Sequence, residues 1–177
     1  KPHCLGFKIF TENIAAVAMQ KLNAKVDKPT YVGLTVLEYA KLHMYRFHYD
    51  QVLRQWPDGR ARLILTDTDS LLYEIETDDV YEDIQGNPDL HDWFDLSNYV
   101  PDHQLYDGSN KMVIGKMKDE TEGKIMCEVV GLRAKMYSFK VFDPVTGQFK
   151  ITKKAKGIQK SAIEILTHEQ YVAQLQD

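Results

Sequence analysis

The sequence predicts an α+β protein, and three observations predict it. Residues 33–56 carry apolar side chains at three- and four-residue spacing, which is typical of a long amphipathic helix. Two short apolar runs, 61–66 and 70–76, follow and predict an antiparallel hairpin with Asp67-Thr68-Asp69 as its tip. Further β-like segments come after residue 110, and a helix that precedes an antiparallel sheet favours the α+β class.

The elements before the hairpin are justified by spacing and by helix signals. Ile14, Val17 and Leu22 recur at helical spacing, so a helix is predicted over residues 11–25. Thr35 followed three residues later by Glu38 predicts a capping box at the start of the long helix. Turn residues end that helix firmly, namely Pro57, Asp58 and Gly59.

After the hairpin, residues 77–110 mix Gly, Pro, Asp and Asn with aromatics, and predict an irregular or partly helical segment. Four β-like segments follow, over residues 111–118, 124–130, 134–142 and 148–153. Residues 161–176 predict two short helices separated near Thr167, where Thr167 and Gln170 fit a second capping box.

The composition is that of a globular domain. The chain has 177 residues, of which 44% are hydrophobic and 27% charged, and this fits one domain or a piece of a larger one. No apolar run approaches the roughly 20 residues of a membrane span. The chain opens on Lys1 and ends in a helical pattern, so we expect an internal fragment. Cys4 and Cys127 lack the spacing of a zinc site or a disulfide framework, and fit a reducing compartment.

Charge is distributed unevenly along the chain. Residues 67–107 contain 13 acidic residues and no Lys or Arg, whereas residues 111–160 contain 12 basic and 5 acidic residues. The first stretch could gather cations and the second could face phosphates. Two solvated surfaces of opposite sign that pair with each other would produce the same distribution, so charge alone leaves both interpretations open.

The aspartates of the hairpin tip are candidate metal ligands, and a tight tip would point both carboxylates the same way. Carboxylates are hard oxygen ligands that suit Mg²⁺, which proteins hold with one or two carboxylates plus waters and substrate phosphates. A polar turn is the alternative, since Asp, Thr and Ser all favour turns. Nucleotide-sugar glycosyltransferases also hold a metal on Asp-x-Asp, but they would place a nucleotide-binding α/β unit where this chain has one long helix.

Three ordered motifs carry a family resemblance. The run Thr66-Asp67-Thr68-Asp69-Ser70 resembles the DTDS palm motif of the family B DNA polymerases. Lys135-Met136-Tyr137 is similar to the KxY motif of that family near the primer terminus, and Lys154-Ala155-Lys156-Gly157 is similar to the basic KxKG segment that leads into the thumb. Residues 28–33, 40–50 and 115–123 resemble the protein-primed enzymes of Polinton/Maverick mobile elements and related viruses, so the likeness covers nearly the whole chain.

The resemblance implies a fold and a division of the chain. It implies a polymerase palm-like antiparallel sheet with the DTDS hairpin, a long packed helix before it, and the start of a thumb. Residues 1–150 would be the C-terminal part of the palm, with the acidic segment 77–110 as an insertion, and residues 151–177 the start of the thumb. Leu65 departs from the family, where many members have an aromatic residue two positions before the first Asp.

The resemblance also implies roles for individual residues. Asp69 would be the principal metal ligand and catalytic residue, with Asp67 beside it in a two-metal Mg²⁺ site. DNA contacts would come from Lys135 and Tyr137 at the primer end and from three lysines on duplex phosphates, Lys153, Lys154 and Lys156. As alternatives, Lys135 and Tyr137 could be the solvent face of a strand, and the three lysines ordinary surface charge.

The implied function is DNA-directed DNA polymerisation, in which a primer 3′-hydroxyl attacks the α-phosphate of a dNTP. The implied partners are a DNA primer–template, a dNTP and a terminal priming protein, with no membrane, in an intracellular place such as the nucleus or a viral replication site. The upstream motif with the second metal-binding Asp and the nucleotide-binding motif are not found before residue 67. We therefore expect this chain alone not to polymerise; a truncated mobile-element remnant that at most binds DNA is the alternative.

Overall fold

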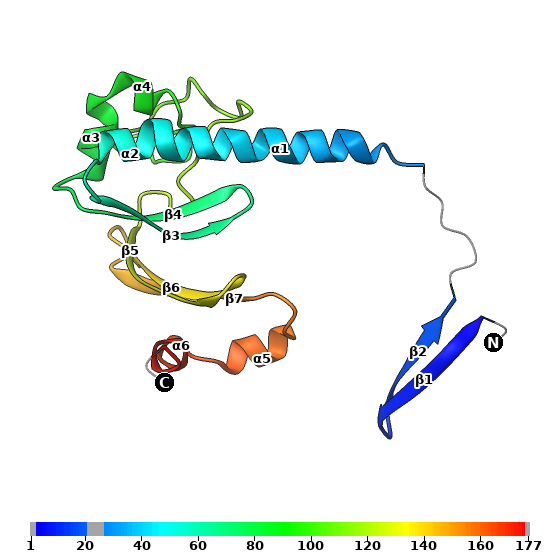
Figure 1. Cartoon of the computed structure of the whole chain (residues 1–177). Coiled ribbons are helices and arrows are strands. Elements are labelled where there is room, and N and C mark those ends of the chain that lie inside the picture. The colour runs from blue at the N-terminus through cyan, green and yellow to red at the C-terminus, as the bar shows by residue number, and fades with distance from the viewer. Residues whose placement is uncertain (1–2, 21–26, 176–177) are drawn as a thin grey trace. The chain divides into compact units, whose positions relative to one another are not determined.

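The computed structural model describes residues 3–20 and 27–175, and it confirms the α+β class. The fold consists of small antiparallel sheets and a few helices (Figure 1). The chain divides into two compact units, Lys1–Leu37 and Glu38–Asp177, and the division falls inside the first helix. The boundary expected between residues 150 and 151 stays a prediction.

Unit 1 contains a two-stranded antiparallel hairpin, β1 (Cys4–Thr11) and β2 (Ile14–Met19). The predicted helix over residues 11–25 is therefore wrong through Met19, and its residues 21–25 lie outside the described residues. Every residue of the two strands is exposed. The apolar residues of β2 have helical spacing, but β2 forms a strand because the preceding segment, β1, is available to pair with it.

The strand character of β1 comes from alternation. Leu5, Phe7 and Ile9 are separated by single residues, Gly6 and Lys8, which is the period of a strand. Two such segments joined by a short turn form a hairpin in preference to a helix that would leave β1 without hydrogen-bond partners.

A long helical run follows and enters unit 2. It consists of α1 (Thr30–Arg46), a π-helical segment η1 (Phe47–Val52) and α2 (Leu53–Gln55). The predicted helix over residues 33–56 is confirmed. Its burial is concentrated at the end of the run: α1 has no buried residue, whereas Phe47 and Val52 are buried.

The start of α1 differs from the predicted capping box of Thr35 and Glu38. The carbonyl oxygen of Pro29 already accepts a hydrogen bond from the N–H of Val32 at 3.0 Å, so the first turn precedes Thr35. The hydroxyl of Thr35 instead donates to the carbonyl oxygen of Tyr31 at 2.9 Å, as Thr does inside a helix.

The predicted hairpin is confirmed as β3 (Ala61–Asp67) and β4 (Ser70–Ile75), paired antiparallel. Asp67 pairs with Ser70, so the turn has two residues and Asp67 belongs to the strand rather than to the tip. The hairpin packs against the end of the helical run, since Ala61 is part of the core cluster.

Two short helices confirm the partly helical character of residues 77–110. They are α3 (Val80–Gly86) and α4 (Pro88–His91), and each begins at an N-cap side chain. The Asp79 carboxylate accepts from the N–H groups at the start of α3, and Asn87 does the same for α4, where Pro88 occupies the first turn.

The strand predicted over residues 111–118 is wrong. This segment is a series of turns with one isolated bridge, between Phe94 and Met117. Met112 and Gly115 have φ of 60° and 88°, which lie outside the β region of a regular strand. The buried carboxylate of Asp95 holds the loop instead, accepting hydrogen bonds from the N–H groups of Ser97 and Met112.

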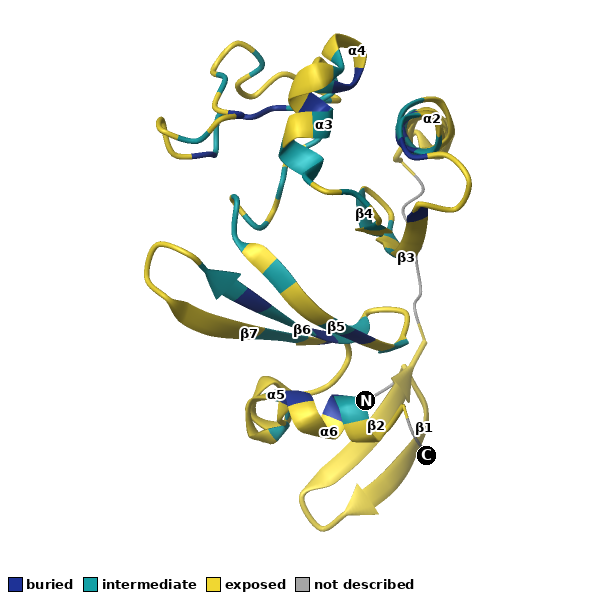
Figure 2. Cartoon of the chain, turned by 90° about the vertical axis from the view of Figure 1, so that its left-hand side faces the viewer, coloured by how far each residue is buried: buried dark blue, intermediate teal, exposed yellow. Residues whose placement is uncertain are grey.

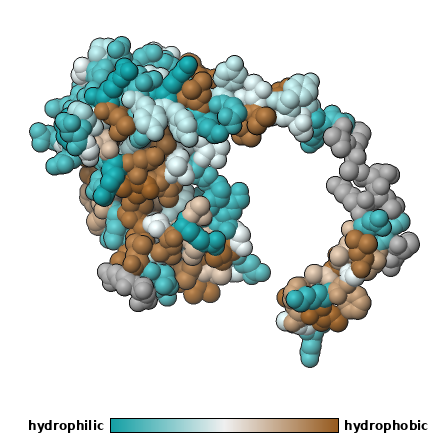
Figure 3. Space-filling model, viewed as in Figure 1, coloured by the Kyte–Doolittle hydropathy of each residue, from teal (hydrophilic) through white to brown (hydrophobic). Residues whose placement is uncertain are grey.

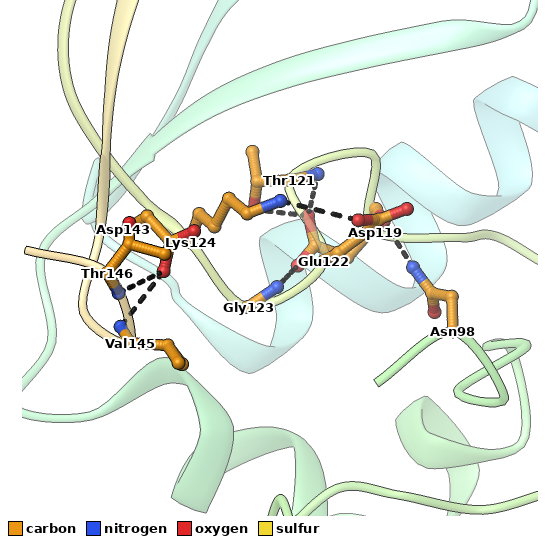
Figure 4. Close-up of polar contacts among 9 residues, drawn as sticks. All are labelled: Asn98, Asp119, Thr121, Glu122, Gly123, Lys124, Asp143, Val145 and Thr146. Atoms are coloured by element: carbon orange, nitrogen blue, oxygen red, sulfur yellow. Dashed lines mark hydrogen bonds and ion pairs between the residues drawn. The ribbon is translucent and has the colours of Figure 1, made fainter. Parts of the chain in front are cut away.

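A three-stranded antiparallel sheet follows, in the order β5 (Ile125–Arg133), β6 (Met136–Asp143) and β7 (Gln148–Ala155). The strands predicted over the corresponding segments are confirmed, and β7 continues past residue 150. The turn between β6 and β7 is held by Asp143, whose side chain accepts from the N–H groups of Val145 and Thr146 (Figure 4).

The chain ends in α5 (Lys160–Ile165) and α6 (His168–Ala173), which confirm the two predicted helical pieces. The capping box at Thr167 is also confirmed. The hydroxyl of Thr167 accepts from the N–H of Gln170 at 3.3 Å, and the side chain of Gln170 accepts from the N–H of Thr167 at 2.8 Å.

The core of unit 2 joins the end of the helical run to the α3–α4 region and the base of the hairpin. Buried positions appear on these elements and on β6 in Figure 2, and a hydrophobic area is visible at the level of β3 and β4 in Figure 3. The core cluster consists of Phe47, Val52, Trp56, Ala61, Ile84, Leu90, Leu96, Tyr99 and Leu105.

Candidate functional site

The tip of the β3–β4 hairpin is a tight turn that fixes the direction of its side chains. The N–H of Asp69 donates to the carbonyl oxygen of Asp67 at 2.7 Å, which is the i→i+2 bond of a γ-turn. The residue between them, Thr68, has a φ of 59°. Ser70 adds a hydrogen bond from its hydroxyl to the carbonyl oxygen of Asp67 at 3.3 Å. The turn conformation is therefore held by the backbone and by Ser70 together.

A second tight turn lies between β5 and β6. Arg133 pairs with Met136, which leaves Ala134 and Lys135 as the turn residues, and Lys135 has a φ of 61°. The carbonyl oxygen of Lys135 accepts a hydrogen bond from the N–H of Lys156 at 3.0 Å. This bond ties the turn to the segment that follows β7.

The two turns meet through an ion pair. The ammonium of Lys135 donates to both carboxylate oxygens of Asp67, at 2.6 Å from Oδ2 and in close contact with Oδ1. The hydrogen bond from Lys135 is the main cause that lowers the pKa of Asp67, and the charges of Lys135 and Lys156 add to it against a smaller opposing effect of burial. The Asp67 carboxylate is therefore ionised at neutral pH.

Around this ion pair lies an open hollow of about 450 Å³, which we call the lysine hollow. It brings together six of the seven residues that the sequence singled out, although they come from β3, from the β5–β6 hairpin, and from β7 with the segment after it. The residues that border it are Asp67, Lys135, Tyr137, Lys153, Lys154, Ala155, Lys156 and Ile163. Four lysines thus border the same hollow as one aspartate.

The seventh residue, Asp69, borders a different hollow. This larger hollow, of about 950 Å³, is lined by the β3–β4 hairpin, the loop of residues 116–124 and one face of the sheet. Tyr137 borders both hollows. Partial burial is the main cause that raises the pKa of Tyr137, so its phenol stays protonated at neutral pH. Asp67 and Asp69 therefore border separate hollows, and the expectation that both carboxylates point the same way stays a prediction.

The loop over the larger hollow is built around Asp119. Its carboxylate accepts from the N–H of Thr121 at 2.8 Å and from the N–H of Gly123 at 2.9 Å, and Figure 4 shows both groups turned toward it. The amide of Asn98 donates to the carbonyl oxygen of Asp119 at 2.6 Å. The resemblance included residues 115–123, but sequence reasoning assigned no role to this loop or to its neighbouring lysines, Lys116, Lys118 and Lys124.

The donor set at the hairpin tip fits Mg²⁺ in type. Two carboxylates, of Asp67 and Asp69, match the one or two that proteins commonly supply beside waters and substrate phosphates. Over residues 3–20 and 27–175 there is no group of three or more His, Cys, Asp or Glu side chains placed to hold a metal. A metal bound by Asp67 would also have to replace the ammonium of Lys135.

Lys153 has a partner that sequence reasoning missed. Its ammonium donates to the carbonyl oxygen of Glu164 at 3.2 Å and, in a shorter contact, to that of Leu166. Carbonyl groups at a helix C-terminus carry partial negative charge and attract cations. Lys153 therefore holds the end of α5 against β7.

A Ser–His–Glu arrangement, in which Ser138 and His168 are buried and Glu128 is exposed, lies on the same face of the sheet as Lys153. Ser138 Oγ is 2.7 Å from His168 Nδ1, and His168 Nε2 is 3.3 Å from Glu128 Oε2. The residue types are those of a hydrolase triad, but Ser138 is 0% exposed, so a substrate cannot reach its hydroxyl. The arrangement instead fastens α6 to β5 and β6.

Comparisons with models of protein families, with curated protein sequences and with solved structures gave no match. In the part of the chain that the structure describes, no helix is both long enough and apolar enough to cross a membrane.

Proposed function

We propose that this chain is part of a DNA-directed DNA polymerase of family B, of the protein-primed type, and that the lysine hollow is where it meets DNA. One observation supports this most directly. Residues of all three motifs border one hollow, although the first motif is far from the others in the sequence. They are Asp67 of the first motif, Lys135 and Tyr137 of the second, and Lys154 and Lys156 of the third. Pairing of β6 with β7 already places Tyr137 beside Lys154, so the meeting of Asp67 with this pair of motifs, through Lys135, is the part of the observation that supports the proposal.

The charges of the hollow suit a phosphate backbone. Lys supplies a point charge for phosphate without reading sequence, which is what a replicating enzyme requires. Lys154 and Lys156 have side chains open to solvent, and Tyr137 presents a protonated hydroxyl that can donate to a phosphate or sugar oxygen. These groups would bind and orient the primer–template, while Asp67 and Asp69 would supply carboxylate oxygens at the hairpin tip.

Magnesium held by Asp67 and Asp69 would stabilise charge on the attacking and leaving oxygens of nucleotidyl transfer from a dNTP. The hairpin tip of this chain provides two carboxylates, those of Asp67 and Asp69, and the ammonium of Lys135 donates a hydrogen bond to Asp67. We therefore predict that the 177-residue chain binds DNA but does not extend a primer. Incorporation of a labelled nucleotide on a primed template by this chain alone would overturn that prediction.

DNA binding is the direct test of the proposal. The full chain is titrated into a fluorescein-labelled primer–template duplex at low salt, and anisotropy reports binding. The double variant K154Q/K156Q should weaken binding by roughly tenfold or more, whatever the duplex sequence, because two phosphate contacts are removed. The matched control K111Q/K140Q removes the same charge from two lysines that border neither hollow and should bind nearly as the unmodified chain does. Equal loss in both double variants would mean that the lysine hollow is not the interface.

A non-catalytic DNA-binding fragment is the second candidate, and the Lys135–Asp67 ion pair favours it. An ammonium on one of the two aspartates is compatible with binding DNA without metal. Two results would support this candidate over the metal-dependent one. The affinity for the duplex would be the same in EDTA and in Mg²⁺, and Mn²⁺ would not broaden the amide NMR signals of Asp67 and Asp69.

A further inference from the structure

We propose that the four lysines of the lysine hollow fall into three roles, of which only one is direct phosphate contact. This inference rests on the proposed function as a DNA interface. Lys154 and Lys156 are the available contacts, Lys153 is a positioning residue for α5, and Lys135 is a latent contact whose charge is neutralised by Asp67.

Lys135 is neutralised by a contact that geometry holds in place. Its ammonium reaches both oxygens of Asp67, while its backbone is fixed by the turn and by the hydrogen bond from the N–H of Lys156. The side chains of Lys135 and Asp67 remain 44% and 33% exposed, so the pair is reachable from solvent. An ion pair of zero net charge displaces no net counterion when a phosphate approaches, so Lys135 adds no salt-dependent contact while Asp67 is ionised.

The side chain of Lys153 lies on the face of the sheet opposite to that of Lys154. Side chains alternate along a strand, so neighbouring Lys153 and Lys154 point to opposite faces of β7. The register agrees: Lys153 pairs with Ser138, which is buried under α6, and Lys154 pairs with Tyr137, which borders both hollows. With its ammonium on the carbonyl groups at the end of α5, Lys153 has no charge to offer to DNA without releasing that helix.

Lys154 and Lys156 remain as the direct contacts. Both have side chains open to solvent, and within the described residues neither side chain makes a hydrogen bond or an ion pair. The charge of Lys156 acts on Asp67 only at longer range. Binding these two ammonium groups to phosphates therefore breaks no contact within the chain.

The salt dependence of DNA binding reports how many phosphates are neutralised and so separates the three roles. Anisotropy of a short labelled duplex with the full chain is measured over a NaCl series in EDTA, where each neutralised phosphate contributes about 0.9 to the slope of log K against log [NaCl]. K154Q and K156Q should each reduce the slope by about this amount. K153Q should leave the slope unchanged and lower the melting temperature.

The latent role of Lys135 is tested by substituting Asp67 alone and then together with Lys135. D67N should increase the slope by about 0.9 because it releases Lys135 to a phosphate, and D67N/K135Q should return to the unmodified slope. If Lys135 already contacts phosphate, D67N will leave the slope unchanged and D67N/K135Q will lower it, which overturns the inference. Circular dichroism and melting of each variant confirm that it is folded.

The result that would overturn this inference differs from the result that would overturn the proposed function. Equal slope losses for K135Q, K153Q, K154Q and K156Q would overturn the division of roles and leave the DNA interface in place. Absence of duplex binding at low salt by the unmodified, folded chain would overturn both the interface and the roles inferred from it.

Discussion

Lys135 lies in the turn of one β-hairpin and Asp67 is the last strand residue before the turn of another, and the ammonium of Lys135 donates to both carboxylate oxygens of Asp67. Both turns include a residue with positive φ that is not glycine, Thr68 in one and Lys135 itself in the other. Such conformations persist when surrounding contacts hold them. The ion pair is one such contact, and it links the β3–β4 hairpin to the β5–β7 sheet.

The coupling between these two residues should depend on salt. In a double-mutant cycle of D67N and K135Q, urea unfolding should reveal a favourable coupling free energy at low ionic strength that shrinks markedly at roughly 1 M NaCl, where charges are screened within about 3 Å. The pair is accessible to solvent, so screening reaches it. A cycle of D67N with K111Q serves as the control and should show no coupling. A coupling that does not change with salt would mean that packing, not charge, joins the turns.

Asp95 should make the fold sensitive to acid. Burial by itself would raise the pKa of Asp95, but hydrogen bonds from Ser97 and Met112 and the ammonium of Lys118 outweigh burial and hold the pKa well below its usual value. A lowered folded-state pKa stabilises the protein above the unfolded-state value of about 3.9, and this contribution is lost as pH falls below it.

We therefore expect D95N to lower the free energy of unfolding at pH 7 by about 1–3 kcal/mol, the cost of an impaired buried hydrogen-bonded group. The unmodified chain should lose stability between about pH 4 and pH 2, and D95N should lose less over this range. Urea unfolding at each pH is the measurement, with D102N at an exposed position as control. Parallel stability curves for the unmodified chain and D95N would contradict the assignment.

Gly123 should not tolerate a side chain. Its φ is 79°, and an added Cβ would lie 3.3 Å from two ring carbons of Tyr99. G123A should destabilise the chain by about 1–2 kcal/mol, the cost of the left-handed conformation for an L-residue. G86A is the matched control, because Gly86 ends α3 with nothing within 4 Å of the added Cβ. It should be neutral or stabilising by up to about 1 kcal/mol. Thermal melts of both variants decide between these outcomes.

Ser138 should contribute to stability and not to catalysis. S138A leaves Nδ1 of the buried His168 without its hydroxyl partner, which should cost about 1–3 kcal/mol. The exposed Ser161 in α5 provides the control, since S161A should change the unfolding free energy by no more than about 0.5 kcal/mol. Loss of ester hydrolysis in S138A, where the unmodified chain shows any, would instead assign a catalytic role to this serine.

Local patterns were sufficient for much of the fold. The helix over residues 33–56, the hairpin strands, the sheet strands and the Thr167 capping box all depend on neighbours a few residues apart, and all are confirmed. The errors arose where a partner outside the segment determined its conformation. Helical spacing in Ile14–Met19 yielded to pairing with β1, and residues 111–118 follow the carboxylate of Asp95 rather than a strand ladder.

For the candidate site, the chemistry could be predicted from the sequence: which side chains are acidic, basic or phenolic, and that Asp67 and Asp69 lie at the tip of a hairpin. Which of these side chains meet depends on how the hairpins and the sheet pack in three dimensions. The tertiary structure placed Lys135 on Asp67, directed Lys153 to α5, and put Asp69 beside another hollow. Motif spacing fixes positions along the chain, whereas strand register and the alternation of side chains across a sheet decide which face each residue occupies.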